Sequence, residues 1–154
     1  MTPDLVARVK LAEGTGPMKD GRHQKYADHL GVSTIGFGFN LEAHRLPAGM
    51  DADKGITRAQ AERLLLLKLQ DAINDARTFA WFASLDEARQ DAVVEMLYQM
   101  GLTRFRGFGR CIAALKAGHY AQASAEILNS RWARVQTPGR AQRIAATIRT
   151  GEPQ

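Results

Sequence analysis

The chain has 154 residues, of which 45% are hydrophobic and 24% charged, and its formal net charge is +5. This length and composition predict one folded domain with a packed core and exclude an intrinsically disordered chain. The positive charge predicts attraction to polyanions, and nucleic acid, an anionic membrane surface and bacterial cell wall all fit it. Because Cys111 is the single cysteine, no internal disulfide is expected, which fits folding in a reducing cytoplasm.

The first residues show no basic segment followed by an apolar core, and no apolar run reaches the length of a membrane span. We therefore expect neither a signal peptide nor stable insertion into a membrane. If the substrate lies outside the cytoplasm, a separate protein must release this one.

The N-terminal part of the chain predicts one helix and then a β region. Apolar residues at helical spacing predict a helix over residues 3–13 that ends at Glu13-Gly14. Glycines and a proline break regular structure over residues 14–21, which predicts a loop before the first strand. The segment from Lys25 to Phe39 is rich in β-branched residues and glycines. It predicts short strands with tight turns and is the only convincing β pattern in the chain.

The remaining sequence predicts helices. A long helix capped by Thr57 runs to about Thr78, and another starts at Ser84 or Asp86 and stops at Gly101. Three shorter helices are expected, one holding Cys111 and ending at Gly118, one from His119 to about Leu128, and one after Thr137-Pro138.

These elements predict an α+β fold in a single domain over residues 1–154. Residues 14–56 form a small α/β lobe with a short antiparallel sheet, and residues 57–154 with the helix of residues 3–13 form a larger helical lobe. The long helix that begins at Thr57 joins the lobes, and the cleft between them suits a polymeric substrate.

Glu13 is the first candidate for catalysis. Hydrolysis of a glycosidic bond needs a carboxylic acid that protonates the leaving oxygen and a second carboxylate across the bond. The negative end of a helix disfavours ionisation, so a glutamate at that position is suited to keep its proton. A surface glutamate before a helix-ending glycine explains the same local pattern.

Asp28 and Thr34 are the next candidates. On a strand, Thr34, Gly36 and Gly38 share one face, where the glycines allow close approach of a ligand and the hydroxyl could orient water. An ordinary glycine-rich hairpin, with Asp28 as a turn former, is the simpler explanation of this segment alone.

Taken together, these motifs and several downstream ones resemble the phage-type lysozymes, the endolysin muramidases of glycoside hydrolase family 24. The matching segments occur in order along most of the chain: Glu13-Gly14, Asp28, Thr34-Ile35-Gly36-Phe37-Gly38, Tyr98-Gln99-Met100-Gly101, Ser130-Arg131-Trp132, Gln136-Thr137-Pro138-Gly139-Arg140-Ala141 and Arg149-Thr150-Gly151.

The resemblance implies a lysozyme-like fold with its active site in the cleft. It also implies hydrolysis of the β-1,4 bond between N-acetylmuramic acid and N-acetylglucosamine in bacterial peptidoglycan, for host-cell lysis. Glu13 is then the proton donor, Asp28 the second carboxylate and Thr34 the residue that places water. No cofactor or metal is required, and the family's usual outcome is inversion.

Further residues match family positions that bind substrate. Asn40 and Tyr98 match positions that touch the sugar chain, and Gln99, Cys111, Trp132 and Arg140 match positions near the cleft. The resemblance implies that Arg140 pairs with Glu13 across the lobes. The implied protein is a monomer that waits in the host cytoplasm for a holin-like partner and then acts on the periplasmic wall.

Two features depart from the family pattern. Fourteen residues separate Glu13 from Asp28, more than is usual, and this longer segment contains a rival carboxylate, Asp20. Asp28 is preferred because its six-residue step to Thr34 keeps the family spacing. Phe39 occupies a position where histidine is common, which removes a salt-bridge partner and puts local stability in doubt.

Other interpretations remain open. The chain could be a non-catalytic glycan-binding or virion-associated wall module of the same fold. Binding to nucleic acid is not expected, since no helix-turn-helix pattern or aromatic-basic interleaving occurs. Glu95 is expected at a solvated helix position, and the histidines lack metal-ligand spacing. Cys111 is expected to be a packed thiol, and the basic C-terminal run a solvated face or one that meets an anionic wall: Arg131, Arg134, Arg140, Arg143 and Arg149.

Overall fold

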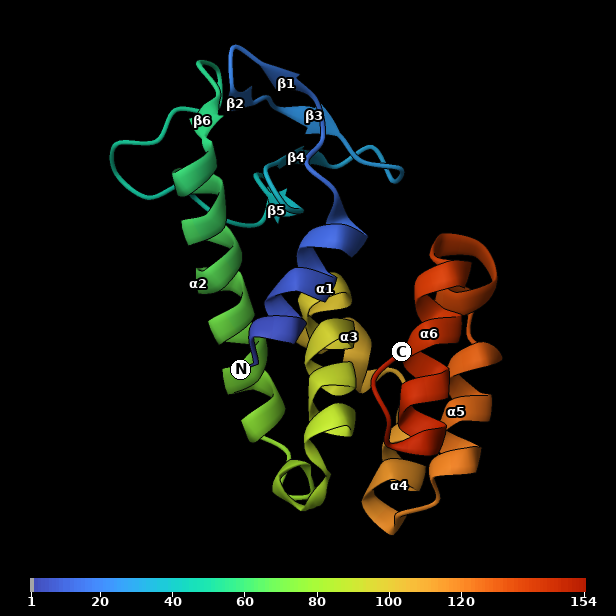
Figure 1. The fold of residues 1–154 in the computed structure, drawn as a ribbon. Helices are drawn as coiled ribbons and strands as arrows, with labels where there is room; N and C mark the ends of the chain where they lie inside the picture. Colours follow the sequence, from blue (N-terminus) through green and yellow to red (C-terminus); the bar gives the residue numbers. More distant parts are fainter. Residues whose placement is uncertain (1) are drawn as a thin grey trace. The chain divides into compact units, whose positions relative to one another are not determined.

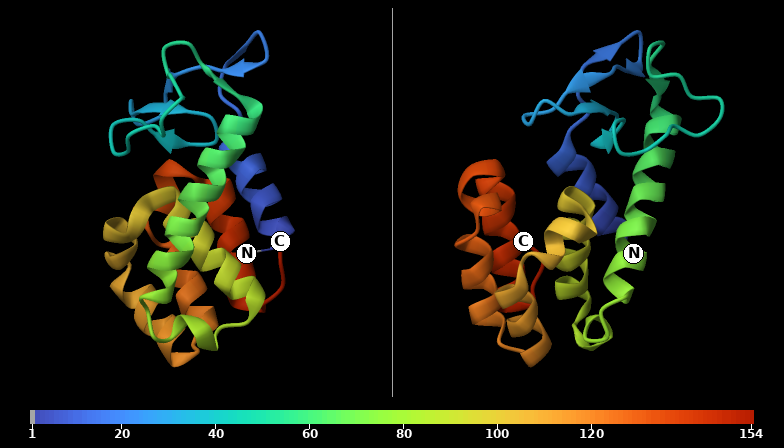
Figure 2. Two further views of the ribbon diagram at one scale, coloured as in Figure 1. Left: turned by 90° about the vertical axis from the view of Figure 1, so that its left-hand side faces the viewer. Right: turned by 180° about the vertical axis from the view of Figure 1, so that it is seen from behind.

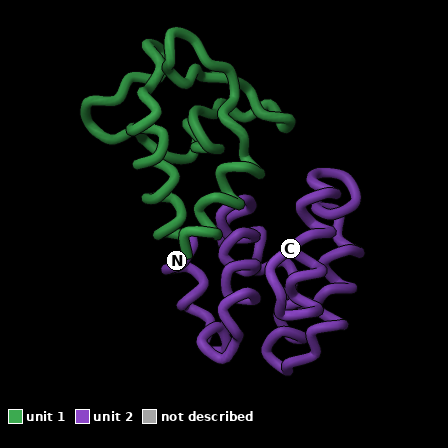
Figure 3. Tube along the Cα trace, viewed as in Figure 1, with its two compact units in different colours: residues 1–71 green, residues 72–154 purple. Residues whose placement is uncertain are grey.

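The computed structural model describes residues 2–154, and the chain divides into two compact units at Asp71–Ala72 (Figure 3). Helix α2, Arg58–Arg77, continues across this point in the sequence. Short antiparallel strands occupy the first unit and helices make up the second (Figure 1), so the predicted α+β class is confirmed. None of the helices within the described part of the chain combines the length and apolarity needed to cross a membrane.

The first unit begins with α1, Pro3–Glu13, as predicted. The side chain of Thr2 accepts a hydrogen bond from the backbone of Leu5 at 3.0 Å and so satisfies one of the free N–H groups at the start of the helix. Leu5 and Val9, four residues apart, are buried. Gly14 ends the helix with a φ of 65° and donates to the carbonyl of Lys10.

The strands of the first unit form two three-stranded antiparallel sheets. In the first sheet the order is β1 (Met18–Lys19), β2 (Arg22–His23) and β6 (Ile56–Thr57). In the second the order is β3 (Tyr26–Ala27), β4 (Ser33–Ile35) and β5 (Phe39–Asn40).

The loop predicted for residues 14–21 is therefore wrong in part. Asp20 and Gly21 make a two-residue turn with φ values of 50° and 73°, which suits the type I′ hairpin between β1 and β2. Two-residue strands are too short to show alternation, and β2 also pairs with β6, which comes more than thirty residues later in the chain. The second sheet lies within the segment predicted to be β, apart from Asn40, the last residue of β5.

A compact apolar cluster lies beneath the second sheet and the start of α2. Its buried members are Ile35, Phe39, Ile56, Ala61 and Leu64. Phe39 thus contributes apolar burial where the family pattern favours a histidine, and the effect of this exchange on local stability stays a prediction.

The start of α2 is stabilised by a reciprocal pair of hydrogen bonds. The backbone of Gln60 donates to the Thr57 hydroxyl at 3.1 Å, and the backbone of Thr57 donates to the Gln60 side chain at 2.9 Å. This is a capping box, which satisfies two free N–H groups at once. The predicted cap at Thr57 is confirmed.

The second unit contains the predicted helices and two short additional ones (Figure 2). Their bounds are η1 Phe82–Ser84, α3 Glu87–Arg106, α4 Gly109–Ala117, α5 Tyr120–Leu128, the π-helical turn η2 Trp132–Gln136, and α6 Pro138–Thr150. Asp86, rather than Ser84, caps α3 by accepting from the backbone of Arg89. Gly101 interrupts α3 with a φ of 77°, after which helical turns resume, so the predicted stop is a kink.

The structure corrects the expectation that Glu95 and Arg143 are solvated, and also the expectation that Thr137 caps the last helix. Glu95 is only 3% exposed and receives two hydrogen bonds from the guanidinium of Arg143, at 2.5 and 3.2 Å, so neither lies on a freely solvated face. The pairing of α3 with α6 that creates this contact is not visible in either helix alone. Thr137 precedes α6 as expected, but its hydroxyl makes no capping bond.

Candidate active site

Glu13 is half-buried at the last position of α1 and faces the turn between β4 and β5. A Cβ atom added to Gly38 would lie 2.6 Å from Oε2 of Glu13 and 3.0 Å from its Cδ. Gly38 also has a φ of 75°, a conformation that other residues rarely adopt. The fold therefore places the carboxyl of Glu13 directly against the backbone of this turn, and a larger residue at position 38 would strain the backbone and displace the carboxyl.

Thr34 lies in the middle of a row across the second sheet. It is paired with Tyr26 on β3 and with Asn40 on β5, so the three side chains share one face. Thr34 is 4% exposed, and its hydroxyl donates to the carbonyl of Val32 at 2.9 Å. Because its proton is committed there, the hydroxyl can act toward any further group only as an acceptor.

Asp28 follows β3 and is half-buried. Its Oδ1 accepts hydrogen bonds from the backbone N–H groups of Leu30 and Val32 at 2.8 and 2.9 Å, so the turn-forming role is confirmed. No group within residues 2–154 donates a hydrogen bond to Oδ2. The carboxylate is thus fixed through one oxygen while the other can act on a ligand or water.

Tyr26 connects the two carboxylates. Its pKa is raised, first by burial and then by the negative charges of Glu13 and Asp28. The Tyr26 phenol, beside Thr34 in the row, is thus within electrostatic range of both carboxylates. Tyr26 was not selected from the sequence, because its place depends on strand register. Gly16 packs against its ring, where a Cβ would lie 2.4 Å from a ring carbon.

The rival Asp20 lies elsewhere. It is exposed in the β1–β2 turn with a positive φ, and its sheet is not the one that carries Thr34. The structure brings Asp28 into the group with Tyr26 and Thr34, and it gives Asp20 the role of a turn residue.

The other predicted site residues belong to the second unit. They are Tyr98 and Gln99 on α3, Cys111 on α4, Trp132 on η2 and Arg140 on α6. Tyr98 is buried. Because Glu13 belongs to the first unit and Arg140 to the second, their pairing stays a prediction.

A groove of about 630 Å³ in the second unit contains two of these residues, Cys111 and Trp132. Trp132 is 5% exposed, and its indole Nε1 is buried with no hydrogen-bond partner among the described residues; the same holds for Oε1 of Gln99. Burial, with a smaller contribution from Glu126, raises the pKa of the Cys111 thiol to about 12. The thiol is therefore protonated and packed, as predicted.

Within the part of the chain that the structure describes, no three His, Cys, Asp or Glu side chains gather as a metal site would require. His23, for example, is buried and uses Nδ1 to contact the carbonyl of Thr15 at 3.0 Å. Because a carbonyl only accepts, Nδ1 carries the proton.

The fold and this site define a class of protein. An α+β chain with a glutamate at a helix end, a glycine-rich turn against it, and an aspartate and a threonine on the sheet that contains this turn has the groups of a lysozyme-like glycoside hydrolase. The family model described as "Phage lysozyme" matches residues 17–147, so the chain belongs to the phage lysozyme family. The match begins just after Glu13.

Two relatives from Dictyostelium discoideum extend the similarity. "Probable T4-type lysozyme 1" is 26% identical over 148 residues, which cover 83% of this chain and 86% of that protein. "Probable T4-type lysozyme 2" is 26% identical over 171 residues, which cover 98% of this chain and 96% of that protein. Membership of the family makes this chain a lysozyme-like glycoside hydrolase and implies peptidoglycan as its substrate.

Proposed function

We propose that this protein is a lysozyme that cleaves the β-1,4 bond between N-acetylmuramic acid and N-acetylglucosamine. Glu13 is the general acid, Asp28 the second carboxylate and Thr34 the residue that places water. One observation carries the proposal: the Glu13 carboxyl lies against Gly38 in the turn that follows the strand of Thr34. In support, the negative charges of Glu13 and Asp28 both contribute to the raised pKa of Tyr26, the neighbour of Thr34 in the sheet.

The proposed reaction divides the chemical steps among these residues. Glu13 donates its proton to the glycosidic oxygen, so the bond from that oxygen to the anomeric carbon breaks and the leaving sugar departs as an alcohol. Asp28 stabilises the positive charge that develops on the ring and accepts a proton from the attacking water. Thr34 accepts a hydrogen bond from the same water. Attack from the face opposite the leaving group gives the inverted product that is usual in the family.

The wider substrate contacts form part of the same proposal. Asn40 extends the row of Tyr26 and Thr34. Its Oδ1 accepts hydrogen bonds from the backbone N–H groups of Glu42 and Ala43, so its side-chain NH2 is the group proposed to donate to a sugar hydroxyl. In the second unit, Tyr98, Gln99, Cys111, Trp132 and Arg140 contribute to binding.

The proposed setting is host-cell lysis. The protein acts as a monomer, is held in the host cytoplasm until a holin-like protein opens the membrane, and then degrades the periplasmic wall. The relationship to phage lysozymes motivates this part of the proposal.

The first prediction compares the three acidic candidates by clearing of a peptidoglycan suspension. Glu13→Gln is expected to lower the rate by about 10²–10⁴-fold, because a neutral amide cannot donate the proton. Asp28→Asn keeps an oxygen for the two backbone N–H groups and removes only the charge, so a large loss with an intact fold is expected. Asp20→Asn is the matched control and should retain wild-type activity.

Circular dichroism and thermal unfolding of each variant show whether the fold is preserved. Clearing by Glu13→Gln at the wild-type rate would contradict the assignment of the acid. A dead Asp20→Asn beside an active Asp28→Asn would transfer the second role to Asp20. If the wild type binds the wall but releases no fragments, the non-catalytic wall module is the better description. The same assay on whole bacteria expressing the protein tests whether lysis requires a permeabilised membrane.

A further inference from the structure

The turn formed by Gly36, Phe37 and Gly38 is held from several sides in the first unit. The ring of Phe37 meets that of His23 edge-on, with 5.3 Å between centroids, and the Lys10 ammonium lies 5.7 Å from the Phe37 centroid. The carbonyl of Gly38 accepts a hydrogen bond from Nζ of Lys68 at 2.8 Å. The turn that contacts Glu13 is thus fixed by side chains of other elements.

Lys68 reaches this turn from α2, thirty residues further along the chain. Its side chain is half-buried, and a charged donor to a carbonyl gives a stronger bond than a neutral one. Gly38 therefore has two neighbours of different kinds. Its α-carbon lies against the Glu13 carboxyl, while its oxygen is held by the Lys68 ammonium.

Helix α2 also holds the element that carries Glu13. Lys10 on α1 forms an ion pair with Glu62 on α2. Helix α2 thus holds both sides of the contact between Glu13 and the turn. Glu62 binds α1, the helix that ends in Glu13, and Lys68 binds the turn itself. Gly14 and Gly16 lie one and three residues after Glu13, both with positive φ.

We propose that Lys68 is a positioning residue for Glu13. By holding the Gly38 carbonyl, it keeps the β4–β5 turn at contact distance from the acid, so the Glu13 carboxyl points in one direction when substrate arrives. This inference rests on the proposed role of Glu13. A shift of the turn by about 1 Å would misplace the proton donor, and displacements of that size can cost about 10²-fold in rate.

The test replaces Lys68 in two ways and includes a control on the same helix. Lys68→Met keeps the length of the side chain and removes the donor, whereas Lys68→Arg keeps a charged donor. Arg63→Met removes an exposed positive charge from α2 and leaves the turn untouched. On soluble uncrosslinked glycan strands, Lys68→Met should lose at least about tenfold in kcat with KM within about twofold. Lys68→Arg should recover most of the loss, and Arg63→Met should match the wild type.

A second readout does not depend on activity. In the wild type, the NMR signal of the Gly38 amide should follow the titration of Glu13, and Glu13→Gln should remove that response. Lys68→Met should reduce it, and Arg63→Met should preserve it. If Glu13→Gln remains active, the proposed function fails, but this measurement still decides whether Lys68 positions Glu13. An unchanged Gly38 response in Lys68→Met, together with a kcat equal to that of Arg63→Met, would overturn the inference.

Discussion

The missing Cβ atoms of two glycines allow close packing around Glu13 and Tyr26. Gly38 faces the carboxyl of Glu13 and Gly16 faces the ring of Tyr26, each at a distance where a Cβ would overlap its neighbour. Both glycines also have positive φ values, of 75° and 63°. Residues that punctuate a loop in the sequence are therefore contact residues in the fold, since only a hydrogen side chain satisfies both the backbone conformation and the close approach.

Asp28 shows how one residue combines structure with chemistry. One carboxylate oxygen organises the β3–β4 turn through two backbone N–H groups, and this orients the other oxygen. The turn-forming explanation and the catalytic one are thus compatible. Because the loop already orients the carboxylate, less free energy is needed to organise it for a reaction.

A residue-scale prediction concerns Cys111 at high pH. Its thiol has a pKa of about 12 in the folded protein, against an ordinary value of 9.0. Between these values the unfolded chain loses a proton that the folded protein keeps, so the free energy of unfolding falls as pH rises through this range. At pH 10.5 the loss should be about 2 kcal/mol, at 1.36 kcal/mol per pKa unit.

Urea unfolding of the wild type and Cys111→Ala at pH 7.5 and 10.5 checks this prediction. Other groups titrate alike in both proteins, so the difference between them isolates the thiol. The wild type should lose more stability than the variant over this interval. Equal losses would show that the Cys111 thiol does not resist ionisation in the folded state.

At the scale of elements, the helix ends are determined locally. Thr2, the Thr57–Gln60 pair and Asp86 cap α1, α2 and α3 with side chains a few residues away. Gly14, Gly118 and Gly151 end α1, α4 and α6 with positive φ. Such signals act over one helical turn, which is why the sequence predicts these bounds to within a few residues.

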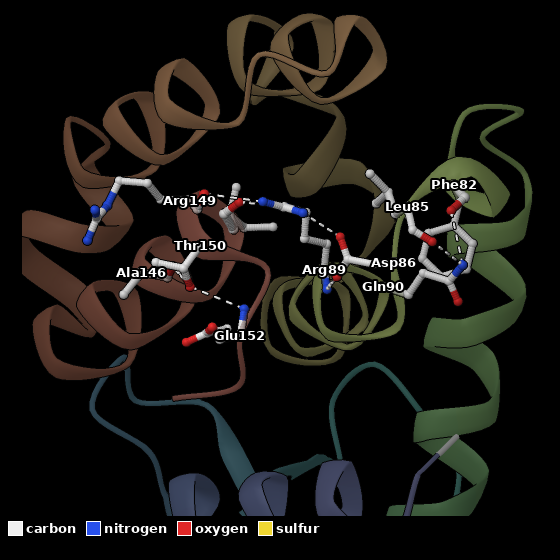
Figure 4. Close-up of polar contacts among 10 residues, drawn as sticks. Phe82, Leu85, Asp86, Arg89, Gln90, Ala146, Arg149, Thr150 and Glu152 are labelled. Carbon is white, nitrogen blue, oxygen red and sulfur yellow. Dashed lines mark hydrogen bonds and ion pairs between the residues drawn. The ribbon is translucent and has the colours of Figure 1, made fainter.

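Arg89 makes a long-range contact between α3 and α6 in the second unit (Figure 4). From the first turn of α3, its Nε donates to the carbonyl of Ile148 at 2.7 Å and its Nη2 to that of Arg149 at 3.2 Å. The last carbonyls of a helix lack partners within it, so Arg89 satisfies the end of α6. Its guanidinium also pairs with Asp86 at 2.5 Å and lies 3.7 Å from the Tyr120 ring centroid.

The pairing also affects Asp86. Burial alone would raise the pKa of its carboxyl, but the hydrogen bonds and charge of Arg89 outweigh burial and lower it. The stability contributed by this pair is therefore present above the ordinary pKa of 3.8 and is lost as pH falls through the lower folded value.

Replacing Arg89 by methionine tests this connection between α3 and α6. The variant should lose about 2–3 kcal/mol in the free energy of unfolding, because it leaves helix-end carbonyls and Asp86 without a charged donor. Arg106→Met, at the exposed end of α3, should change the same quantity by less than about 0.5 kcal/mol. Urea unfolding midpoints measure both. Similar midpoints for the two variants would mean that Arg89 contributes no more than a surface arginine.

At the scale of the whole molecule, the net charge of +5 is unevenly distributed along the chain. Most of the excess positive charge lies in residues 72–154. Three exposed arginines, Arg104, Arg110 and Arg131, line the groove that contains Trp132, against a single carboxylate there, that of Glu126. This distribution favours contact between the second unit and an anionic wall.

Binding to isolated peptidoglycan should therefore depend on salt. In the Glu13→Gln background, which separates binding from cleavage, the fraction that sediments with the wall should fall as ionic strength rises, because exposed charges are screened. Arg104→Glu or Arg131→Glu should weaken sedimentation severalfold more than Lys54→Glu, an exposed charge change in the first unit. A salt-independent fraction, or equal effects of these changes, would argue against the second unit as the wall-facing surface.

By itself, the sequence determined the α+β class, the main helices, the cap at Thr57, the helix ends at Gly14 and Gly118, and the relationship to phage-type lysozymes, because these rest on periodicity and motifs within short windows. Only the tertiary structure decided the β1–β2 hairpin, the buried Glu95–Arg143 pair, the place of Tyr26 beside Thr34, and the contacts of Gly38 with Glu13 and Lys68. Each of these depends on strand register or on residues far apart in the chain. No local pattern encodes such pairs, since their geometry exists only once the elements have packed.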